Sequence, residues 1–359
     1  MRVLAALSGG VDSAVAAARA VDAGHEVTAV HLALSRNPQS HRSGARGCCT
    51  LEDSNDAFRA ADAIGAPFYV WDLSEEFQHR VIDDFIEQYS VGRTPNPCLR
   101  CNESIKFSAL LERATALGFD ALCTGHYARV VNGPHGTELH RAVDPDKDQS
   151  YVLGVMTEAQ IARSIFPLGE STKEQVRLEA AQRGLTVAQK PDSHDICFIP
   201  DGDTAGWLAQ RIPTQPGPVL DGGAGQQVGS HQGAEALTAG QRRGLALGNP
   251  TGDGERRYVV DVDVARNTVL VGPPTLLEVD LIQAGPPIWA GPTPASGDNV
   301  DVQVRAHGST VPGTIHPMAE GIELRLAQTI RGVAAGQTAV MYDGTRVVGS
   351  ATVDRAGRQ

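Results

Sequence analysis

Residues 8–13, Ser-Gly-Gly-Val-Asp-Ser, have the types and spacing expected of an anion-binding turn. An apolar run over residues 3–7 precedes them and predicts a buried parallel strand. The paired glycines allow a tight turn, and Asp12 or Ser13 can cap the helix predicted over residues 14–23. A strand, a glycine turn and a helix N-terminus direct several backbone N–H groups to one point. Such a point attracts an anion, usually phosphate.

This turn fits neither G-x-x-x-x-G-K-[ST] nor G-x-G-x-x-G, and no Gly-Lys pair occurs in the chain. Residues 8–13 match the SGGxDS signature of the PP-loop (N-type) ATP pyrophosphatases. That resemblance implies cleavage of ATP between the α and β phosphates, adenylation of a carbonyl oxygen, and binding of the departing pyrophosphate by the loop. An ordinary strand–turn–helix connection without a ligand is the alternative. The signature indicates the activation chemistry but not the substrate.

Two cysteines follow in residues 92–102, Gly-Arg-Thr-Pro-Asn-Pro-Cys-Leu-Arg-Cys-Asn. Two prolines within four residues predict an extended, rigid loop that presents Cys98 and Cys101, with a helix beginning near Glu103. A thiol beside a helix N-terminus, with arginine and lysine side chains nearby, has reasons for a lowered pKa. The segment is therefore a candidate site for a nucleophile.

Other chemically competent residues are predicted near the same crevice. A strand predicted over residues 119–123 runs into a glycine turn that carries His126. This position favours a role for His126 at the ligand crevice over a purely structural role in the core. Residues 147–151 (KDQSY) fit either a capped helix start or a polar clamp on a substrate. Leu32, near the end of the second predicted strand, fits adenine packing or a plain core position. Cys197 lies between apolar residues, where a buried inert thiol is the alternative to a reactive one.

Length and composition bound the class of protein. With 359 residues, the chain should form two or three domains, and 41% hydrophobic with 20% charged residues fit a soluble globular protein. No apolar run approaches the roughly 18 residues of a membrane span, and we see no signal peptide, so the cytoplasm is the expected location. Six cysteines in a cytosolic chain favour reduced, catalytic or metal-binding roles over a disulfide framework.

The charge balance leaves a nucleic-acid partner open. A formal net charge of −11 argues against one, yet 27 of the 31 basic residues are arginine and only 4 are lysine. Arginine binds phosphate through a planar fork and stacks on bases, so local arginine patches can bind RNA on an acidic body. Net charge alone therefore does not exclude RNA.

Alternation of strands and helices over the first 120 residues predicts a doubly wound α/β domain with a parallel sheet. The strands are predicted at residues 3–7, 26–34, 67–73 and 119–123, and the helices at 14–23, 51–64 and 75–89. From about residue 201 the composition changes, because residues 201–255 hold 13 of the 39 glycines. A small domain of short strands and turns is predicted there. Later apolar runs predict a C-terminal β-barrel, with strands at 300–305, 321–327, 339–342 and 346–353.

Seven motifs in register resemble those of the tRNA-specific 2-thiouridylases, the MnmA/TrmU family, over essentially the whole chain. They are SGGVDS (8–13), GRTPNPCLRCN (92–102), TGHYAR (124–129), KDQSY (147–151), DICF (195–198), GQRRGL (240–245) and RGVAAGQTAV (331–340). The resemblance implies a tRNA-uridine 2-sulfurtransferase with an adenine nucleotide α-hydrolase-like PP-loop domain (1–204), a central mostly-β domain contacting tRNA (205–280), and a C-terminal barrel (281–359). ATP with Mg²⁺ would adenylate O2 of the wobble uridine (position 34) in tRNAs for Glu, Gln and Lys. A cysteine persulfide would then displace AMP to give 2-thiouridine.

The resemblance also implies the site residues. The ATP-binding set is Ala6, Leu7, Ser8, Gly9, Gly10, Val11, Asp12, Ser13, Leu32 and Gly125. The tRNA-binding set is Asn96, Pro97, His126, Lys147, Asp148, Gln149, Arg305, His307 and Gln337. Cys197 would carry the persulfide, and Cys101 would attack it, leaving a Cys101–Cys197 disulfide for a reductant to reopen. A cysteine desulfurase or a sulfur-relay protein would supply the sulfur.

One position departs from the family pattern. Many members have an aspartate, assigned as a general acid/base, where this chain has Cys98. The resulting C-x-x-C pair and Cys197 provide three thiolates that could hold a [4Fe–4S] cluster with one open iron. A cluster route and a persulfide route are therefore both open at this point. Cys48 and Cys49 resemble a pair seen in many members, and we assign them no role.

Two other classes of function fit less of the sequence. An amidating or ligating synthetase, of the argininosuccinate- or NAD-synthetase type, would account for residues 8–13 but leave Cys101, Cys197 and the barrel without a purpose. A non-catalytic tRNA-binding protein with a relic loop is disfavoured by the intact cysteine motifs.

Overall fold

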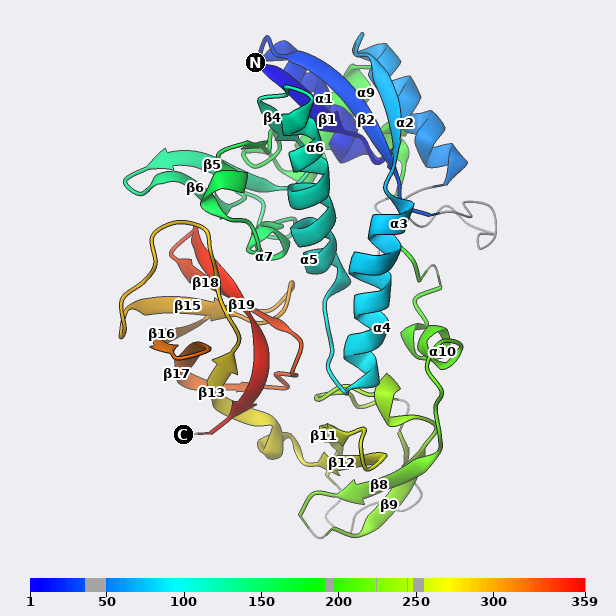
Figure 1. The fold of residues 1–359 in the computed structure, drawn as a ribbon, viewed down its shortest axis with the longest axis vertical. Helices are drawn as coiled ribbons and strands as arrows, with labels where there is room; N and C mark the ends of the chain where they lie inside the picture. Colours follow the sequence, from blue (N-terminus) through cyan, green and yellow to red (C-terminus); the bar gives the residue numbers. More distant parts are fainter. Residues whose placement is uncertain are drawn as a thin grey trace.

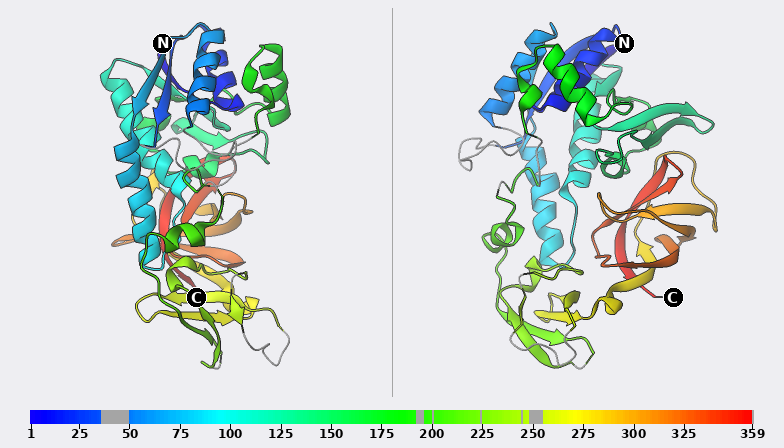
Figure 2. Two further views of the ribbon diagram at one scale, coloured as in Figure 1. Left: turned by 90° about the vertical axis from the view of Figure 1, so that its right-hand side faces the viewer. Right: turned by 180° about the vertical axis from the view of Figure 1, so that it is seen from behind.

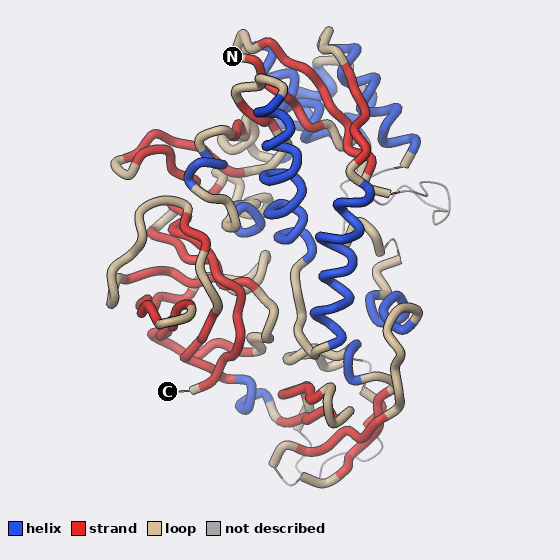
Figure 3. Tube along the Cα trace, viewed as in Figure 1, coloured by secondary structure: helices blue, strands red, loops and turns tan. Residues whose placement is uncertain are grey.

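The computed structural model describes residues 1–35, 50–191, 196–199, 201–223, 225–243, 245–247 and 255–358. Figure 1 shows a parallel-sheet part that contains the N-terminus, a smaller β-rich part at the opposite end, and a β-barrel beside both. Most of the helical structure lies in the first part, together with two long helices that lead away from it (Figure 3). Strands dominate the rest of the molecule. Among the described residues, no helix combines the length and apolar character needed to cross a bilayer.

The N-terminal part is built on a parallel sheet of five strands. They are β1 (Arg2–Ala6), β2 (Glu26–Ala33), β3 (Phe68–Asp72), β4 (Ala121–Cys123) and β7 (Ser164–Ile165). Their order is β3-β2-β1-β4-β7, with Val3 of β1 paired to Val27 on one side and to Ala121 on the other. The chain adds strands first on one side of β1 and then on the other, so the topological switch point lies between β1 and β4. The predicted doubly wound domain is confirmed.

Helices cover both faces of this sheet. The first face carries α1 (Val11–Asp22), α2 (Leu51–Ala63) and α9 (Lys173–Gln182), packed with the sheet in one apolar core. Small alanine side chains fill much of that core, which lets α1 lie close to β1. The sequence prediction started this helix at Ala14, three residues later than its observed start. A second core on the opposite face includes side chains of the two long helices and of two barrel strands, β18 (Thr338–Asp343) and β19 (Arg346–Gly357).

Two long helices stand side by side below the sheet (Figures 1 and 2). The first runs through α3 (Ser74–Phe77), the π-helical η1 (Gln78–Ile82) and α4 (Asp83–Ser90). The second runs through α5 (Pro97–Cys101), the π-helical η2 (Asn102–Leu110) and α6 (Leu111–Ala116). Both views of Figure 2 place the central β part at the end of these helices that is remote from the parallel sheet.

The predicted extended loop through Cys101 is wrong, because the helix begins at Pro97 rather than near Glu103. Asn96 caps the helix, its side-chain oxygen accepting from the N–H of Cys98 at 3.0 Å and of Leu99 at 3.4 Å. Proline is well suited to the first helical position, where its missing N–H would have no intrahelical partner. The second proline therefore starts the helix instead of preventing it.

A β-hairpin joins the N-terminal part to the barrel. Its strands are β5 (Ala128–Gly133) and β6 (Gly136–Arg141), and β6 pairs with β19 of the barrel through His140 and Arg346. The short helices α7 (Ser150–Leu153), α8 (Glu158–Ile161), η3 (Thr186–Gln189) and α10 (Thr204–Ala209) complete the described N-terminal half. The sequence did not predict this hairpin.

The central part is a small mixed sheet of the order β10-β9-β8-β12-β11. Its strands are β8 (Gly217–Asp221), β9 (Gln227–His231), β10 (Ala246–Leu247), β11 (Tyr258–Asp263) and β12 (Thr268–Gly272), with the 3-10 turns η4 (Ala234–Ala236) and η5 (Pro274–Leu277). Valines 219, 259, 269 and 271 form most of its core, which agrees with the predicted domain of short strands.

The C-terminal part is a closed antiparallel barrel, as predicted. Its strands are β13 (Glu278–Ala284), β14 (Ile288–Trp289), β15 (Asn299–Gln303), β16 (Val311–Met318), β17 (Gly321–Arg331), β18 (Thr338–Asp343) and β19 (Arg346–Gly357). Closure follows because β13 pairs with β17 on one side and with β19 on the other. The sequence prediction lacked β13, β14 and β16.

The turn before α5 touches both β parts. Thr94 donates its N–H to the Ala335 carbonyl of the barrel at 2.7 Å, and its hydroxyl bonds that of Thr238 in the central part at 3.1 Å. Arg93 pairs with Asp354 of β19 at 3.0 Å. The segment that leads into Cys98 is therefore held by all three parts of the molecule.

Candidate functional site

The glycine turn lies at the switch point of the parallel sheet. Gly9 has φ +80°, which glycine adopts easily, and Gly10 caps α1 without contributing a side chain. The Ser13 hydroxyl donates to the Gly10 carbonyl and accepts from the Ser8 N–H, both at 3.1 Å. The turn is thus closed by its own serine. The first N–H groups of a 12-residue helix have no intrahelical partners and lie at the mouth of this turn.

Two neighbouring segments pack closely against the turn. Both contacts require glycine, because a Cβ atom would clash with backbone atoms. A Cβ on Gly125, which follows β4, would lie 2.6 Å from the Ser13 nitrogen. A Cβ on Gly9 would lie 2.3 Å from the Asp53 carbonyl oxygen of α2. The turn is therefore held between the end of β4 and the start of α2. The structure brings Gly125 to residues 8–13, as the family resemblance implies for a nucleotide site.

The acidic residue of the turn is paired. The Asp12 carboxylate accepts from the Lys173 ammonium at 2.7 and 2.8 Å and from the Tyr127 hydroxyl at 2.8 Å. Lys173 is the first residue of α9, and the sequence did not identify it as a site residue. These contacts fix the direction of the carboxylate at the mouth of the turn.

Three of the four lysines of the chain lie around this turn, in a chain where arginine supplies 27 of 31 basic residues. Lys173 contacts Asp12, Lys190 contacts the Gly9 carbonyl at 3.0 Å, and Lys106 contacts His126 beside Gly125. A compact ammonium with three donors suits close contacts that a planar guanidinium does not fit. The scarcity of lysine was therefore a signal in the sequence that could have pointed to this site.

His126 is buried between two aromatic rings, Phe107 and Phe166. Its Nδ1 lies 2.7 Å from the Thr124 hydroxyl and its Nε2 lies 3.4 Å from the Lys106 ammonium. Burial, together with the Lys106 charge, holds the pKa of His126 well below its usual value. The ring is therefore neutral near pH 7. Because Lys106 can only donate, Nε2 accepts, and Nδ1–H donates to the threonine.

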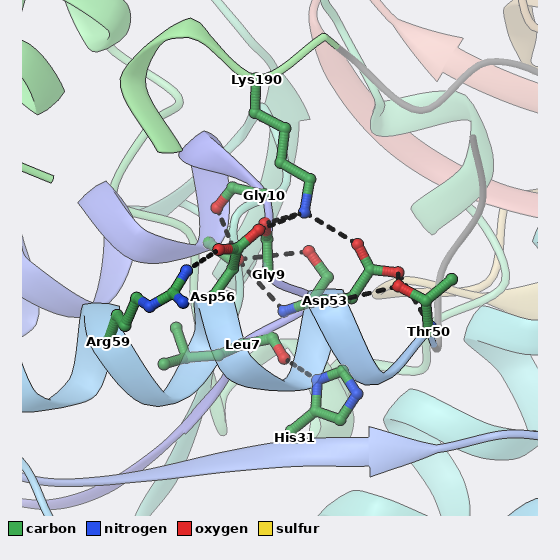
Figure 4. A network of polar contacts seen from close by, with 11 residues as sticks. Leu7, Gly9, Gly10, His31, Thr50, Asp53, Asp56, Arg59 and Lys190 are labelled. Atoms are coloured by element: carbon green, nitrogen blue, oxygen red, sulfur yellow. Dashed lines mark hydrogen bonds and ion pairs between the residues drawn. The ribbon is translucent and has the colours of Figure 1, made fainter. Parts of the chain in front are cut away.

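The remaining predicted nucleotide residues lie on β1 and β2. Ala6 ends β1, and the Leu7 carbonyl is 2.8 Å from Nδ1 of His31 on β2 (Figure 4). Burial lowers the pKa of His31. Leu32 is half-buried and packs against the core on the far side of the sheet from α1. Because it lies on β2, it is one strand away from β1, which leads into the turn.

The cysteines have different environments. Cys98 is exposed on the first turn of α5, Cys101 is buried at its end, and Cys197 is half-buried. Cys197 and Phe198 pack against the same core that contains Cys101. The Phe198 ring contacts the rings of Phe77 at 6.1 Å and Phe85 at 5.3 Å, which anchors this segment on the first long helix. The Cys101–Cys197 disulfide stays a prediction.

The arrangement does not support the iron–sulfur alternative. Within the described part of the chain, no three His, Cys, Asp or Glu side chains are placed to hold one metal ion. Cys98 and Cys101 differ in exposure although they are three residues apart. Cys48 and Cys49 lie outside the described residues. Cys123 is buried at the end of β4, where its thiol donates to the Ala16 carbonyl at 3.6 Å and burial raises its pKa to about 12.

Several predicted tRNA-binding residues have structural partners in the chain. Asn96 caps α5, and Pro97 is its buried first residue. Asp148 accepts from Arg141 at 2.9 Å and from the Ser150 hydroxyl at 2.7 Å. The side-chain oxygen of Gln149 accepts from the Tyr127 N–H at 2.9 Å. The Ser150 hydroxyl also lies 3.2 Å from the Tyr342 hydroxyl of β18, so the KDQSY motif joins the parallel-sheet part to the hairpin and the barrel.

The predicted barrel residues lie on two turns next to the central part. Arg305 and His307 are exposed, and the Arg305 guanidinium donates to the Gly332 carbonyl. Gln337 is half-buried, with its side-chain oxygen accepting from the Ala334 N–H at 3.0 Å. Lys147 is half-buried just before Asp148. Arg305 and His307 therefore share one turn of the barrel.

A glycine turn at the switch point of a parallel sheet, followed by two β domains, defines a three-domain protein of the HUP/PP-loop class. Family models described as the tRNA methyl transferase HUP domain, the tRNA methyl transferase PRC-barrel domain and the aminomethyltransferase beta-barrel domain match residues 1–201, 205–273 and 279–353.

The chain is also similar to curated proteins named tRNA-specific 2-thiouridylase MnmA. It is 58% identical over 358 residues to that of Acidothermus cellulolyticus, covering 100% of this chain and 99% of the relative. Identity to that of Beutenbergia cavernae is 60% over 365 residues, with 100% and 96% covered, and to that of Salinispora arenicola 61% over 358 residues, with 98% and 99% covered. The chain belongs to the family of tRNA-specific 2-thiouridylases.

Solved structures resemble the chain only weakly. A 4-thiouridine synthetase–RNA complex with bound ATP has 18% identity and a TM-score of 0.33, covering 59% of this chain and 50% of that one. An NMN synthetase from Francisella tularensis has 20% identity and a TM-score of 0.32, with 54% and 66% covered. These scores are too low to support a conclusion about this chain.

Proposed function

We propose that the protein is an ATP-dependent tRNA-uridine 2-sulfurtransferase that makes 2-thiouridine, AMP and pyrophosphate. The observation that carries the proposal is the end-to-end identity of 58–61% to relatives named tRNA-specific 2-thiouridylase. The geometry supports it because an anion-binding turn and two cysteine segments lie in one domain. In this proposal residues 1–204 are catalytic, and residues 205–280 and 281–359 contact tRNA.

The first half-reaction uses the glycine turn. Uridine O2 attacks the α-phosphorus of ATP, and the bond to the β-phosphate breaks, so pyrophosphate leaves. The N-terminus of α1 and the N–H groups of residues 9–13 would bind that anion as its charge develops. Mg²⁺ would neutralise phosphate charge, and Asp12 offers the carboxylate oxygen that this ion prefers. In the present structure Lys173 and Tyr127 hold that carboxylate.

The second half-reaction uses two thiols. The terminal sulfur of a Cys197 persulfide attacks C2 of the adenylated base, and AMP leaves. The Cys101 thiolate then attacks Sγ of Cys197 and breaks the sulfur–sulfur bond, which leaves sulfur on C2 and a Cys101–Cys197 disulfide. A two-electron reductant must reopen the disulfide. Packing of both segments against one core supports this pairing.

The acceptor is proposed to be the wobble uridine of tRNAs for Glu, Gln and Lys. An anticodon loop presents unpaired bases, so placing one in a pocket costs little. Arg305 and His307 are exposed on the barrel and are candidates for contacts with the phosphate backbone of the tRNA. A cysteine desulfurase or relay protein would load Cys197. With these partners, the cytoplasm is the proposed location of the reaction.

An ATP–pyrophosphate exchange assay tests this proposal. Wild-type protein should exchange labelled pyrophosphate into ATP only when unmodified tRNA is present, because the base oxygen is the adenylated group. Exchange with a free amino acid or carboxylate in place of tRNA would instead indicate an amidating or ligating synthetase. No exchange with any tRNA would contradict the proposal.

A further inference from the structure

Lys190 makes three polar contacts with groups around the glycine turn (Figure 4). Its ammonium donates to the Gly9 carbonyl at 3.0 Å, to Oδ1 of Asp53 at 2.9 Å and to Oδ2 of Asp56 at 2.7 Å. Three acceptors use all three N–H bonds of a lysine. The side chains are shielded, with exposed fractions of 18% for Lys190, 10% for Asp53 and 12% for Asp56.

The contact with Gly9 fixes the orientation of one peptide group. None of the described peptide bonds is cis, so the Gly9 carbonyl and the Gly10 N–H point in opposite directions. Lys190 holds the carbonyl toward α2, and the Gly10 N–H therefore points away from α2. Gly10 is the N-cap of α1, where N–H groups are expected to meet the anion.

The lysine itself is held in place from behind. The Arg177 side chain of α9 donates to the carbonyls of Ala188 and Lys190, both at 3.0 Å. The Lys190 N–H also bonds the Val187 carbonyl at 3.0 Å. Asp53 is fixed in turn, because its Oδ2 accepts from the N–H and hydroxyl of Thr50 in a capping box. The ammonium is thus a preorganised group.

We propose that Lys190 is a positioning residue for the ATP half-reaction, which orients the Gly9–Gly10 peptide so that the Gly10 N–H meets the departing pyrophosphate. This proposal takes from the proposed function only the reaction that Lys190 serves, the cleavage of ATP. The positioning itself is argued from the contacts of Lys190. It is distinct from charge compensation of Asp53 and Asp56, because an ammonium and a guanidinium compensate charge equally. Only the compact ammonium reaches two carboxylates and one carbonyl from a single atom.

The test compares Lys190→Met, Lys190→Arg and the control Arg59→Met in tRNA-dependent ATP–pyrophosphate exchange. Arg59 pairs with the other oxygen of Asp56 at 3.1 Å, and its side chain is 59% exposed. Its loss therefore leaves the hydrogen bond between Lys190 and the Gly9 carbonyl unchanged. We expect Lys190→Met to lower kcat on the order of 10²-fold with a smaller change in KM for ATP, as for loss of one transition-state donor. Arg59→Met should stay within about twofold of wild type.

Two variants, Lys190→Arg and a neutral triple variant, separate positioning from stability. Lys190→Arg should recover the thermal stability that Lys190→Met loses, but not kcat. The neutral triple variant Asp53→Asn, Asp56→Asn, Lys190→Met should also be stable and slow. Wild-type kcat in either variant would show that Lys190 only compensates charge, and would overturn the proposal.

A direct binding measurement keeps this inference separate from the proposed function. If the wild type lacks tRNA-dependent exchange, the proposed function fails. The role of Lys190 is then tested by calorimetry, which measures the affinity of each variant for inorganic pyrophosphate. Binding should weaken about tenfold in Lys190→Met and remain unchanged in Arg59→Met. Equal binding by both variants would refute the positioning role.

Discussion

At the scale of single residues, the proposed chemistry depends on thiols that the fold treats differently. Cys123 is buried and its pKa is raised to about 12, so it stays protonated and unreactive at neutral pH. Cys101 and Cys197 lie in segments that share one core, and Cys98 is exposed. Position, rather than residue type, therefore distinguishes the thiols proposed for sulfur transfer.

Replacement of Cys101 or Cys197 by serine should abolish 2-thiouridine formation. A hydroxyl can neither carry a persulfide nor break one, whereas tRNA binding does not depend on either thiol. Mass spectrometry of tRNA nucleosides measures the product, and a filter-binding assay measures tRNA affinity. Cys123→Ala is the matched control and should retain thiolation. Normal 2-thiouridine from Cys101→Ser or Cys197→Ser would refute the assigned roles.

The Asp53–Lys190 pair should make stability depend on pH. Burial alone would raise the pKa of Asp53, but hydrogen bonds from Lys190 and Thr50 hold it below its usual 3.8. A lowered carboxyl pKa contributes stability that is complete above 3.8 and is lost as the pH falls through the lower folded-state value. The pKa of Lys190 is raised above its usual 10.5, because the hydrogen bonds that it donates to both carboxylates outweigh burial. Its contribution to stability is complete below pH 10.5 and is lost as the pH rises through the higher folded-state value.

Urea unfolding of wild type and Lys190→Met at several pH values measures this effect. We expect the variant to be less stable by about 3 kcal/mol near neutral pH, because it leaves carboxylates buried without their cation. The difference should shrink as the pH falls through the lowered pKa of Asp53 in the wild type, because Asp53 is then protonated in both proteins. A difference that is constant with pH would show that the pair contributes no linked proton.

At the scale of elements, the start of α5 decides where Cys98 and Cys101 lie. Asn96 caps the helix and Pro97 occupies its first position, so both cysteines are on helical turns rather than in an extended loop. A first turn of helix also leaves N–H groups near Cys98. The local order of the segment that carries Cys98 and Cys101 thus depends on a capping side chain that the resemblance associates with tRNA.

Asn96→Ala should cost about 1 kcal/mol in the free energy of unfolding, because the N–H groups of Cys98 and Leu99 lose their acceptor. Asn96→Asp should restore most of this stability. Chemical denaturation of the three proteins gives the comparison. If Asn96→Ala is as stable as wild type while thiolation falls, the side chain acts on substrate rather than on the helix.

The sequence predicted elements that carry their own local signal. Apolar runs located the parallel strands around the glycine turn, and alternation located most of the barrel. The hairpin β5–β6 was missed although its two strands pair with each other across a short turn. Its pairing with β19, about 200 residues away, has no local pattern that could show it. Lys173 and Lys190 were missed for the same reason, since their partners Asp12 and Gly9 are distant in sequence.

At the scale of the whole molecule, the barrel is docked on the nucleotide domain through a buried polar cluster. The Arg141 guanidinium lies 3.7 Å from the centre of the Tyr342 ring and donates to Asp148 at 2.9 Å and to Gln303 at 2.7 Å. The Tyr151 hydroxyl donates to the Thr338 carbonyl at 2.9 Å. These contacts hold the exposed barrel face at a fixed position relative to the nucleotide turn.

Arg141→Met should destabilise the protein by about 3–5 kcal/mol, because Asp148, whose side chain is 8% exposed, loses its partner. Arg325→Met is the control, since Arg325 is 51% exposed in its pair with Glu323 and should change stability by less than about 1 kcal/mol. Urea unfolding measures both changes, and limited proteolysis reports whether the barrel separates. Equal stability of the two variants would show that the cluster does not hold the domains together.

ATP-dependent activation and sulfur insertion are expected to occur on the same nucleoside. The most direct measurement incubates wild-type protein with ATP, a persulfide-generating cysteine desulfurase, a reductant and unmodified tRNA for Glu. Mass spectrometry of the nucleosides is then compared with the AMP released. We expect one 2-thiouridine at the wobble position for each AMP, with neither product formed when tRNA is omitted. AMP release without tRNA, or AMP without 2-thiouridine, would contradict the account.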